Sequence, residues 1–275
     1  MFSKQYQSAI LIAKILDVDV LDVILNKHII PDNKQSIVDF KLEQLQKGVP
    51  LDYLLEQIQI LSLSLKITPD TLIPREETEE WITRFKDLMK RQKHNLDLVV
   101  DLGSGSGIIG LSLADIYNQV WLVDISEKSL DVAFDNASDN GITNTRFLQC
   151  DGLDRTFERA LSQHHPKSWN LIANLPYLPA QDKESAKEFK VFFEPEVSLY
   201  SGVDGLDLFR RVLTQIQDIE LKPEITLWEL DPRNILEAEV LLQALDYQTV
   251  IWQDKNGLNR LLIGYFVCCP YFESR

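Results

Sequence analysis

The 275-residue chain has few cysteines and few histidines. Its cysteines number three, and Cys268 and Cys269 are adjacent, so they do not make a disulfide framework. That usage is typical of a reducing compartment, where a thiol serves as a small core residue. The histidines show no metal-ligand spacing, and we expect no bound metal; they are His28, His94, His164 and His165.

The chain also lacks a recognisable targeting or membrane-spanning segment. The first apolar run, residues 9–16, is interrupted by Lys14, so no N-terminal signal stands out. The longest run without a charged residue, 261–272, is too short to cross a bilayer. We therefore expect a cytoplasmic protein that binds no membrane, and we expect a monomer.

Basic charge is scarce, and the net charge is −14. Residues 1–72 carry 7 Lys/Arg and 9 Asp/Glu, a balance of −2, so the remaining −12 belongs to residues 73–275. Proteins that grip nucleic acid alone normally present a basic surface, so no direct nucleic-acid binding is expected. The acidic surface either keeps the protein soluble or faces a basic protein partner.

The first 50 residues have helical periodicity and no catalytic cluster. Apolar residues recur at three- and four-residue steps in two short segments and then in a longer one. We expect Asn33 to cap the longer helix and Gly48 to follow its C-terminus. These features predict a helical substrate-docking domain over residues 1–58.

The period changes to two after the helical segment. Leucines and isoleucine alternate with polar residues from Leu61 to Ile67, which predicts a half-buried strand. Together with the following Pro-Asp-Thr-Leu-Ile-Pro, it predicts a β-hairpin linker over residues 59–75. After Pro74, a helix is expected to begin with acidic residues in its first turn, where the helix dipole favours them.

From residue 96 onward, apolar strands alternate with amphipathic helices. Strands are expected at 98–102, 120–123, 146–149, 169–173, 225–230, 249–252 and 261–267. Helices are expected at 108–116, 128–140, 206–219 and 237–245. This alternation predicts an α/β, Rossmann-like domain over residues 76–275, with helices on both faces of a mainly parallel sheet. Such sheets bind ligands beyond the carboxyl ends of their strands.

A glycine-rich loop follows the first of these strands. Gly103, Gly105 and Gly107 permit a tight turn and close approach of a ligand, and the next helix offers free N–H groups. Asp124 ends the second strand about twenty residues on, where a carboxylate can bind ribose hydroxyls. The spacing predicts an adenosine-containing cofactor and leaves NAD and S-adenosylmethionine open.

The fourth strand ends on an amide. Asn174 is followed by Leu175, Pro176 and Tyr177. The Asn174 side-chain oxygen and the Leu175 carbonyl can accept the two N–H groups of a planar –NH2. Pro176 stiffens the loop, and Tyr177 can pack flat on the acceptor group. Such positioning suits methyl transfer to a weak nitrogen nucleophile. A turn-capping Asn beside a core tyrosine is the alternative.

Several segments together resemble the release-factor glutamine methyltransferases of the HemK/PrmC type, which use an Asn-Pro-Pro-Tyr motif. The match runs over most of residues 48–265. The segments are GVPLDYLL, LIPREETEEWI, DLGSGSGIIGLSLA, VDISEKSLDVAFDNA, FEPEVSLYSGVDGL and KNGLNRLLIG. LIPREETE and FEPEVSLYSGVDGL are the most diagnostic, because general methyltransferases lack them.

The resemblance implies a class I methyltransferase fold, with a mixed seven-stranded sheet whose last strand is antiparallel. It favours S-adenosylmethionine as the cofactor, bound by Asp101, Gly103, Ser104, Gly105, Ser106, Gly107, Asp124, Asp151, Gly152 and Asn174. It implies substrate binding by Asn174, Leu175, Pro176 and Tyr177, with Asn174, Pro176 and Tyr177 catalytic. The implied reaction is N5-methylation of the glutamine in the Gly-Gly-Gln motif of a peptide chain release factor.

Three positions depart from the family pattern. Leu175 replaces the first proline of the acceptor motif, Glu76 replaces the proline of Arg-Pro-Glu-Thr-Glu, and Gly152 stands where an aromatic residue is frequent. Asn-Leu-Pro-Tyr is also the form found in ribosomal RNA adenine-N6 dimethyltransferases, so that activity is an alternative. A non-catalytic S-adenosylmethionine-binding module is another. The acidic methyltransferase domain and the preceding helical domain favour a protein substrate.

Overall fold

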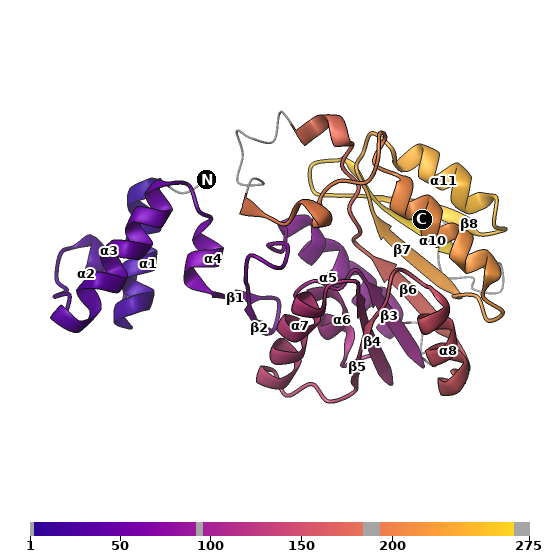
Figure 1. Cartoon of the computed structure of the whole chain (residues 1–275), viewed down its shortest axis with the longest axis horizontal. Coiled ribbons are helices and arrows are strands. Elements are labelled where there is room, and N and C mark those ends of the chain that lie inside the picture. Colours follow the sequence, from indigo (N-terminus) through magenta and orange to yellow (C-terminus); the bar gives the residue numbers. More distant parts are fainter. Residues whose placement is uncertain (1–2, 92–95, 184–192, 267–275) are drawn as a thin grey trace.

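The computed structural model describes residues 3–91, 96–183 and 193–266. Predictions for His94, Val267, Cys268 and Cys269 lie outside these residues. Four N-terminal helices gather at one end of the molecule, and a hairpin lies between them and a larger body built on a sheet (Figure 1). Within the described residues, no helix combines the length and the hydropathy needed to span a membrane.

The N-terminal helices are α1 (Lys4–Leu16), α2 (Val20–Ile24), α3 (Asp32–Gln46) and α4 (Leu51–Leu55). Gly48 adopts φ +95° just after the end of α3, as predicted for a residue that follows a helix. The prediction for Asn33 was wrong, because α3 begins directly after Pro31 and Asn33 lies inside its first turn. Proline cannot sit in a helix interior, so it marks the boundary more sharply than an asparagine does.

The hairpin pairs β1 (Gln57–Ile60) with β2 (Leu63–Lys66). Leu63 and Leu65 are buried, as the alternation predicted. Leu61, however, lies in the turn at φ +52°, and no strand forms in the Pro-Asp-Thr-Leu-Ile-Pro segment, so the predicted strand pairing was wrong. The real partner strand was missed because it is only four residues long, although Ile58 and Ile60 alternate with the exposed Gln57 and Gln59. The division into three domains stays a prediction.

The sheet has seven strands in the order β5-β4-β3-β6-β7-β9-β8. The parallel strands β3 to β7 are Leu98–Leu102, Gln119–Asp124, Thr145–Gln149, Trp169–Ala173 and Ile225–Glu229. The last strand, β9 (Asn259–Tyr265), is antiparallel to both β7 and β8 (Gln248–Gln253). The predicted mixed α/β sheet is confirmed. Its strand order reverses at β3 and β6, where such sheets open a crevice.

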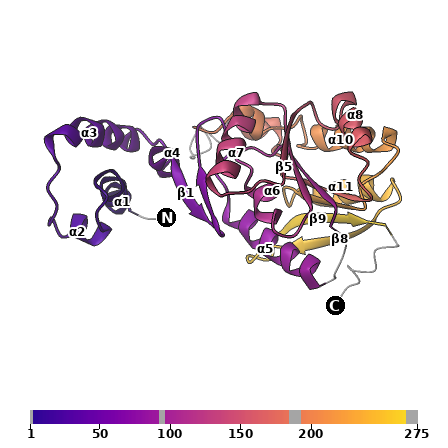
Figure 2. The ribbon, with the colours of Figure 1, turned by 90° about the horizontal axis from the view of Figure 1, so that it is seen from below.

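Helices cover both faces of the sheet and enclose two apolar cores (Figure 2). One face carries α5 (Glu76–Arg91), α6 (Ile108–Leu113) and α7 (Glu127–Asp139). The other carries α8 (Arg155–His164), α10 (Asp207–Asp218) and α11 (Ile235–Gln243). Helix α8 was not predicted, although Asp154 caps its N-terminus and Phe157 packs between Trp121 and Trp169.

Asn136 of α7 and Asn140, which caps the C-terminus of that helix, attach the hairpin to the body of the molecule. The buried Asn136 side chain accepts from the Lys66 N–H (2.6 Å) and donates to the carbonyls of Lys66 (3.1 Å) and Ser106 (2.8 Å). Asn140 makes a similar pair of bonds with the backbone of Ser64 (2.9 and 2.8 Å). One buried amide therefore joins the hairpin to the glycine-rich loop.

We predict that Asn136→Ala lowers the free energy of unfolding by about 2–4 kcal/mol, because buried backbone groups lose their hydrogen-bond partners. The half-buried Asn140 provides a matched control, and Asn140→Ala should cost about 1–2 kcal/mol. Urea unfolding followed by circular dichroism measures both. Equal losses in the two variants would contradict the special role of Asn136.

Candidate functional site

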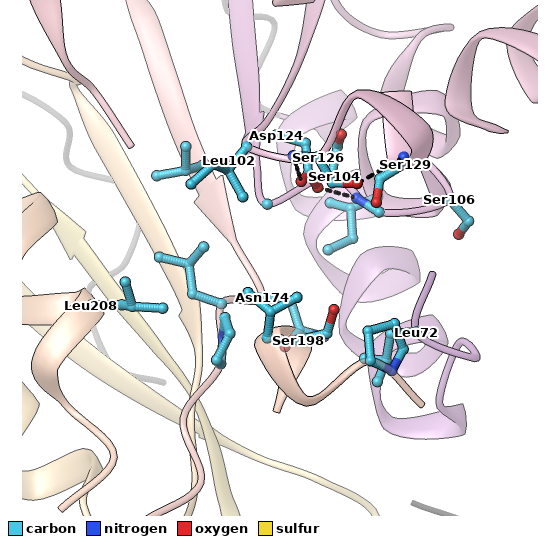
Figure 3. A pocket seen from close by; sticks show the side chains of 18 of the residues that line it. Leu72, Leu102, Ser104, Ser106, Asp124, Ser126, Ser129, Asn174, Ser198 and Leu208 are labelled. Atoms are coloured by element: carbon cyan, nitrogen blue, oxygen red, sulfur yellow. Dashed lines mark hydrogen bonds between the residues drawn. The ribbon is translucent and has the colours of Figure 1, made fainter. Parts of the chain in front are cut away.

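A cavity of about 370 Å³ opens beyond the carboxyl ends of the central parallel strands. Its walls include Gly103–Ser106 after β3, Asp124 at the end of β4, residues 150–152 after β5 and residues 174–176 after β6. Figure 3 shows Ser104, Asp124 and Ser126 on one side of the cavity, with Asn174 and Ser198 on the other. This is the edge of the sheet at which the sequence placed the ligand.

The wall formed by the glycine-rich loop presents polar groups to the cavity. The Asp124 carboxylate accepts from the N–H groups of Gly105 (2.9 Å) and Ser126 (2.9 Å), and burial raises its pKa. Within the described residues, the buried Ser104 hydroxyl has no hydrogen-bond partner. The Asp124 carboxylate and the unpaired Ser104 hydroxyl lie beside the backbone of Gly103 and Gly105, where no side chain blocks a ligand. Such a wall suits a ligand that carries hydroxyl groups.

The opposite wall carries the acceptor motif. Asn174, Leu175 and Pro176 all line the cavity, and β6 is fixed on both sides by β3 and β7. Gly103 has φ +71°, which favours glycine, and a Cβ there would lie 2.7 Å from Leu175 Cδ2 and displace that side chain. Leu175 therefore packs against the glycine-rich loop, where the family pattern has a proline.

Tyr177 lies behind the acceptor loop and does not line the cavity. Its hydroxyl donates to the Glu229 carboxylate (3.4 Å), and its carbonyl accepts from the Asn234 amide (3.2 Å). Burial raises the pKa of Tyr177 and the pKa of Glu229. In this position Tyr177 fixes the path of the loop, and its contact with an acceptor group stays a prediction.

Asp101 and Gly107 also lie outside the cavity lining. Gly107 is the residue before α6, and the fully buried Asp101 accepts from the Gly110 N–H (2.7 Å). Within the described chain, the second Asp101 oxygen has no partner. Burial, together with the nearby charge of Asp124, raises the pKa of Asp101 to about 7. Asp101 therefore fixes the first turn of α6, the helix that follows the glycine-rich loop.

The turn after β5 is held by α10. Asp151 forms an ion pair with Arg211, and the Gln215 side chain accepts from the Leu153 N–H (2.8 Å) and donates to the Asp151 carbonyl (3.1 Å). Gly152 has φ +71°, and a Cβ there would collide with Gln215. Gln215 thus occupies the space beside Gly152, which explains why this chain carries no aromatic residue at that position.

Sequence reasoning missed part of the cavity lining, namely Pro69, Leu72, Pro74, Thr78, Pro195, Val197, Ser198, Leu208 and Arg211. Most of these residues belong to or adjoin LIPREETE and FEPEVSLYSGVDGL, which carried a resemblance without an assigned role. Glu76 begins α5 and is exposed, and its carboxylate binds Lys255 (2.5 Å) instead of taking the place of a buried proline. No metal-binding cluster of His, Cys, Asp and Glu occurs in the described part of the chain.

The sheet order and the cavity define a methyltransferase of the Rossmann-like class. A family model described as a methyltransferase domain matches residues 93–185. The fold is similar to the catalytic domain of human METTL16 in complex with a MAT2A 3′UTR hairpin, with a TM-score of 0.59, 14% identity and coverage of 86% of this chain and 82% of that chain. It is also similar to a human methyltransferase 10 domain containing protein (TM-score 0.54, 14% identity, 84% and 96% coverage).

Proteins that are similar in sequence identify the family within this class. The chain is 30% identical to the release factor glutamine methyltransferase of Coxiella burnetii, over 84% of this chain and 80% of that protein. It is 31% identical to the release factor glutamine methyltransferase of Mycoplasma mycoides, over 82% of this chain and 79% of that protein. It is 29% identical to the one of Bacillus cereus, over 93% of this chain and 90% of that protein. This chain belongs to the release factor glutamine methyltransferase family.

The raised pKa of Asp101 predicts a pH-dependent stability. An acid whose pKa rises on folding destabilises the folded state as the pH climbs from its unfolded pKa to its folded pKa. Asp101→Asn keeps an acceptor for the Gly110 N–H but does not titrate. The free energy of unfolding of this variant minus that of the native protein should therefore rise by about 4 kcal/mol between pH 4 and pH 8. Urea unfolding at several pH values measures the difference, and a constant difference would contradict the raised pKa.

Proposed function

We propose that this protein transfers a methyl group from S-adenosylmethionine to the side-chain amide nitrogen of a glutamine in a peptide chain release factor. Membership of the family supports the cofactor, the reaction and the substrate class. The observation that carries the proposal is the arrangement of Asn174 and Leu175 across one cavity from Asp124 and the glycine-rich loop. The Gly-Gly-Gln motif is the finer proposal for the site of modification.

The residues on the Asp124 side suit the nucleoside part of this cofactor. Asp124 and the unpaired Ser104 hydroxyl would hold ribose hydroxyls, and the backbone of Gly103 and Gly105 leaves room for a chain that carries the sulfonium. When bound, S-adenosylmethionine supplies an electrophilic methyl group. Asp151 and Gly152, held by α10, would border the base.

The residues on the Asn174 side suit a planar amide. The lone pair of an amide nitrogen is delocalised, so the group reacts only when it is held in line with the methyl group. The Asn174 side-chain oxygen and the Leu175 carbonyl would accept its two N–H groups and direct the nitrogen across the cavity. The nitrogen–methyl bond forms as the sulfur–methyl bond breaks, which leaves S-adenosylhomocysteine and releases one amide proton. The apolar side chains of Leu72, Pro74 and Pro176 would exclude water there.

An exocyclic adenine amine has the same hydrogen-bonding groups, so ribosomal RNA is the competing substrate. The charge of −12 over residues 73–275 repels a phosphate backbone and complements a basic protein surface. A release factor contacts ribosomal RNA when it acts, and a surface that contacts a phosphate backbone is normally basic. The charge therefore favours a protein substrate without direct contact to nucleic acid, and we propose that the enzyme acts as a monomer.

The test mixes the purified protein with labelled S-adenosylmethionine and a release factor, and maps the methyl group by mass spectrometry. We predict a methylated glutamine, and Asn174→Ala should lower the turnover by about 100-fold or more, because one of two positioning acceptors is lost. The affinity of this variant for S-adenosylhomocysteine should change little. Label on adenine when ribosomal RNA replaces the release factor, with none on the release factor itself, or full turnover without Asn174, would refute the proposal.

Cofactor binding has its own prediction. Asp124→Ala should weaken S-adenosylhomocysteine binding by about 10- to 100-fold, since hydrogen bonds to a charged acceptor contribute about 1.5–3 kcal/mol. Isothermal titration calorimetry measures the dissociation constant, and the thermal midpoint checks folding. Unchanged affinity in a folded Asp124→Ala protein would show that the carboxylate does not hold the cofactor.

A further inference from the structure

LIPREETE and FEPEVSLYSGVDGL meet at an ion pair between the buried Glu194 carboxylate and the partly exposed Arg75 side chain. The Glu194 side chain is 1% exposed, and its Oε2 lies 2.5 Å from Arg75 Nη2. The other oxygen, Oε1, accepts from the Ile73 N–H (3.3 Å). Both carboxylate oxygens are thus bound by one short stretch of chain that lies more than a hundred residues earlier in the sequence.

Neither residue lines the cavity, but their neighbours do. Leu72 and Pro74 line it just before Arg75, and Pro195, Val197 and Ser198 line it just after Glu194. In Figure 3, Leu72 and Ser198 lie on the same side of the cavity as Asn174, away from Asp124. The ion pair therefore joins two strips of backbone on the acceptor side of the cavity.

Glu194 is also next to the region where the N-terminal helices join the body. Phe193 packs against a core cluster that contains Tyr53 and Ile73. The Tyr53 hydroxyl, from α4, donates to the Thr71 carbonyl (2.8 Å). The strip before Arg75 is therefore held by α4 on one side and by Glu194 on the other.

Stability alone is a weak reason for this ion pair. Taking a carboxylate out of water has a desolvation cost that its partner only partly offsets, and an apolar pair of similar volume is often as stable. Burial raises the pKa of Glu194, and Arg75 opposes that shift. What a charged, two-point contact adds is a defined geometry.

We infer that Arg75 and Glu194 are positioning residues. Their ion pair, here called the rim clasp, sets the spacing between two strips of cavity lining, which are Leu72 with Pro74 and Pro195 with Val197 and Ser198. That spacing admits the glutamine side chain of the protein substrate and guides its amide to Asn174. The inference rests on the proposed function and adds residues that determine how the acceptor enters. Because the rim clasp lies on the acceptor side, cofactor binding does not depend on it.

The experiment compares Glu194→Gln, Arg75→Gln and the double variant with a matched control. Glu196→Gln is that control, because Glu196 lies in the same turn but is exposed, and it pairs with Lys183 at the surface (2.9 Å). Each single rim-clasp variant should lower kcat/KM for the release factor by about 10-fold or more, mainly through KM. The kcat/KM of the double variant should be no lower than that of the more impaired single variant, because both substitutions remove the same ion pair. The control should match the native protein.

The affinity for S-adenosylhomocysteine separates positioning from general damage. It should stay within about twofold of the native value in every folded variant, since a twofold change is well under 1 kcal/mol. Normal kcat/KM in both single variants would overturn the inference. So would a loss of cofactor affinity that parallels the loss of kcat/KM, because the rim clasp would then act on the whole cavity.

Failure of the proposed function can be told apart from failure of the rim clasp. If the native protein methylates no release factor, the function fails, and hydrogen–deuterium exchange decides the rim clasp. Faster exchange at the amides of Leu72, Ile73, Arg75 and residues 196–199 in Glu194→Gln, but not in Glu196→Gln, supports it. Unchanged exchange at both places overturns it.

Discussion

The parallel register of three strands determines where the chemistry of this protein lies. Leu102 of β3 is paired with Val123 of β4 on one side and with Ala173 of β6 on the other. The next residues along the three strands are Gly103, Asp124 and Asn174, so the register alone brings them to the same edge of the sheet. A shift of one residue in β6 would exchange the side chains that it presents to the two apolar cores, because Trp169, Leu171 and Ala173 face one core and Ile172 faces the other. Packing of the two cores therefore favours the register that aligns the site.

The polar groups at this edge depend on the apolar strands behind them. All five residues of β3 and all five of β6 are buried, and the carboxylate of Asp101 is buried with them. Asp101 is tolerated because the Gly110 N–H binds one oxygen and the raised pKa reduces its charge. The carboxyl group of Asp101 thus holds α6 behind the glycine-rich loop, while Asp124 faces the cavity beside the loop.

Local patterns predicted the parts of the fold in which burial and sequence period coincide. The predicted bounds of β3 and β6 were correct, because polar residues on both sides of a short apolar run define where a buried strand begins and ends. The partner strand β1 was missed although its two isoleucines alternate with two glutamines, because a run of four residues is too short to distinguish a strand from the end of a helix. The ends of strands also predicted Asp124 and Asn174 in the cavity. The position of Tyr177 could not be predicted, since it depends on Glu229 and Asn234, which approach from distant segments.

The start of α5 links these distant parts. Thr78 Oγ1 and Trp81 Nε1 both donate to Glu229 Oε2 (2.7 Å each), and Glu229 Oε1 accepts from the Tyr177 hydroxyl. Three donors on one buried carboxylate satisfy it without a cation in direct contact. The segment that supplies Arg75 to Glu194 therefore also fixes Tyr177 behind the acceptor loop. A methyltransferase that must hold a protein side chain needs this loop braced from both sides, which gives LIPREETE a physical reason to accompany the acceptor motif.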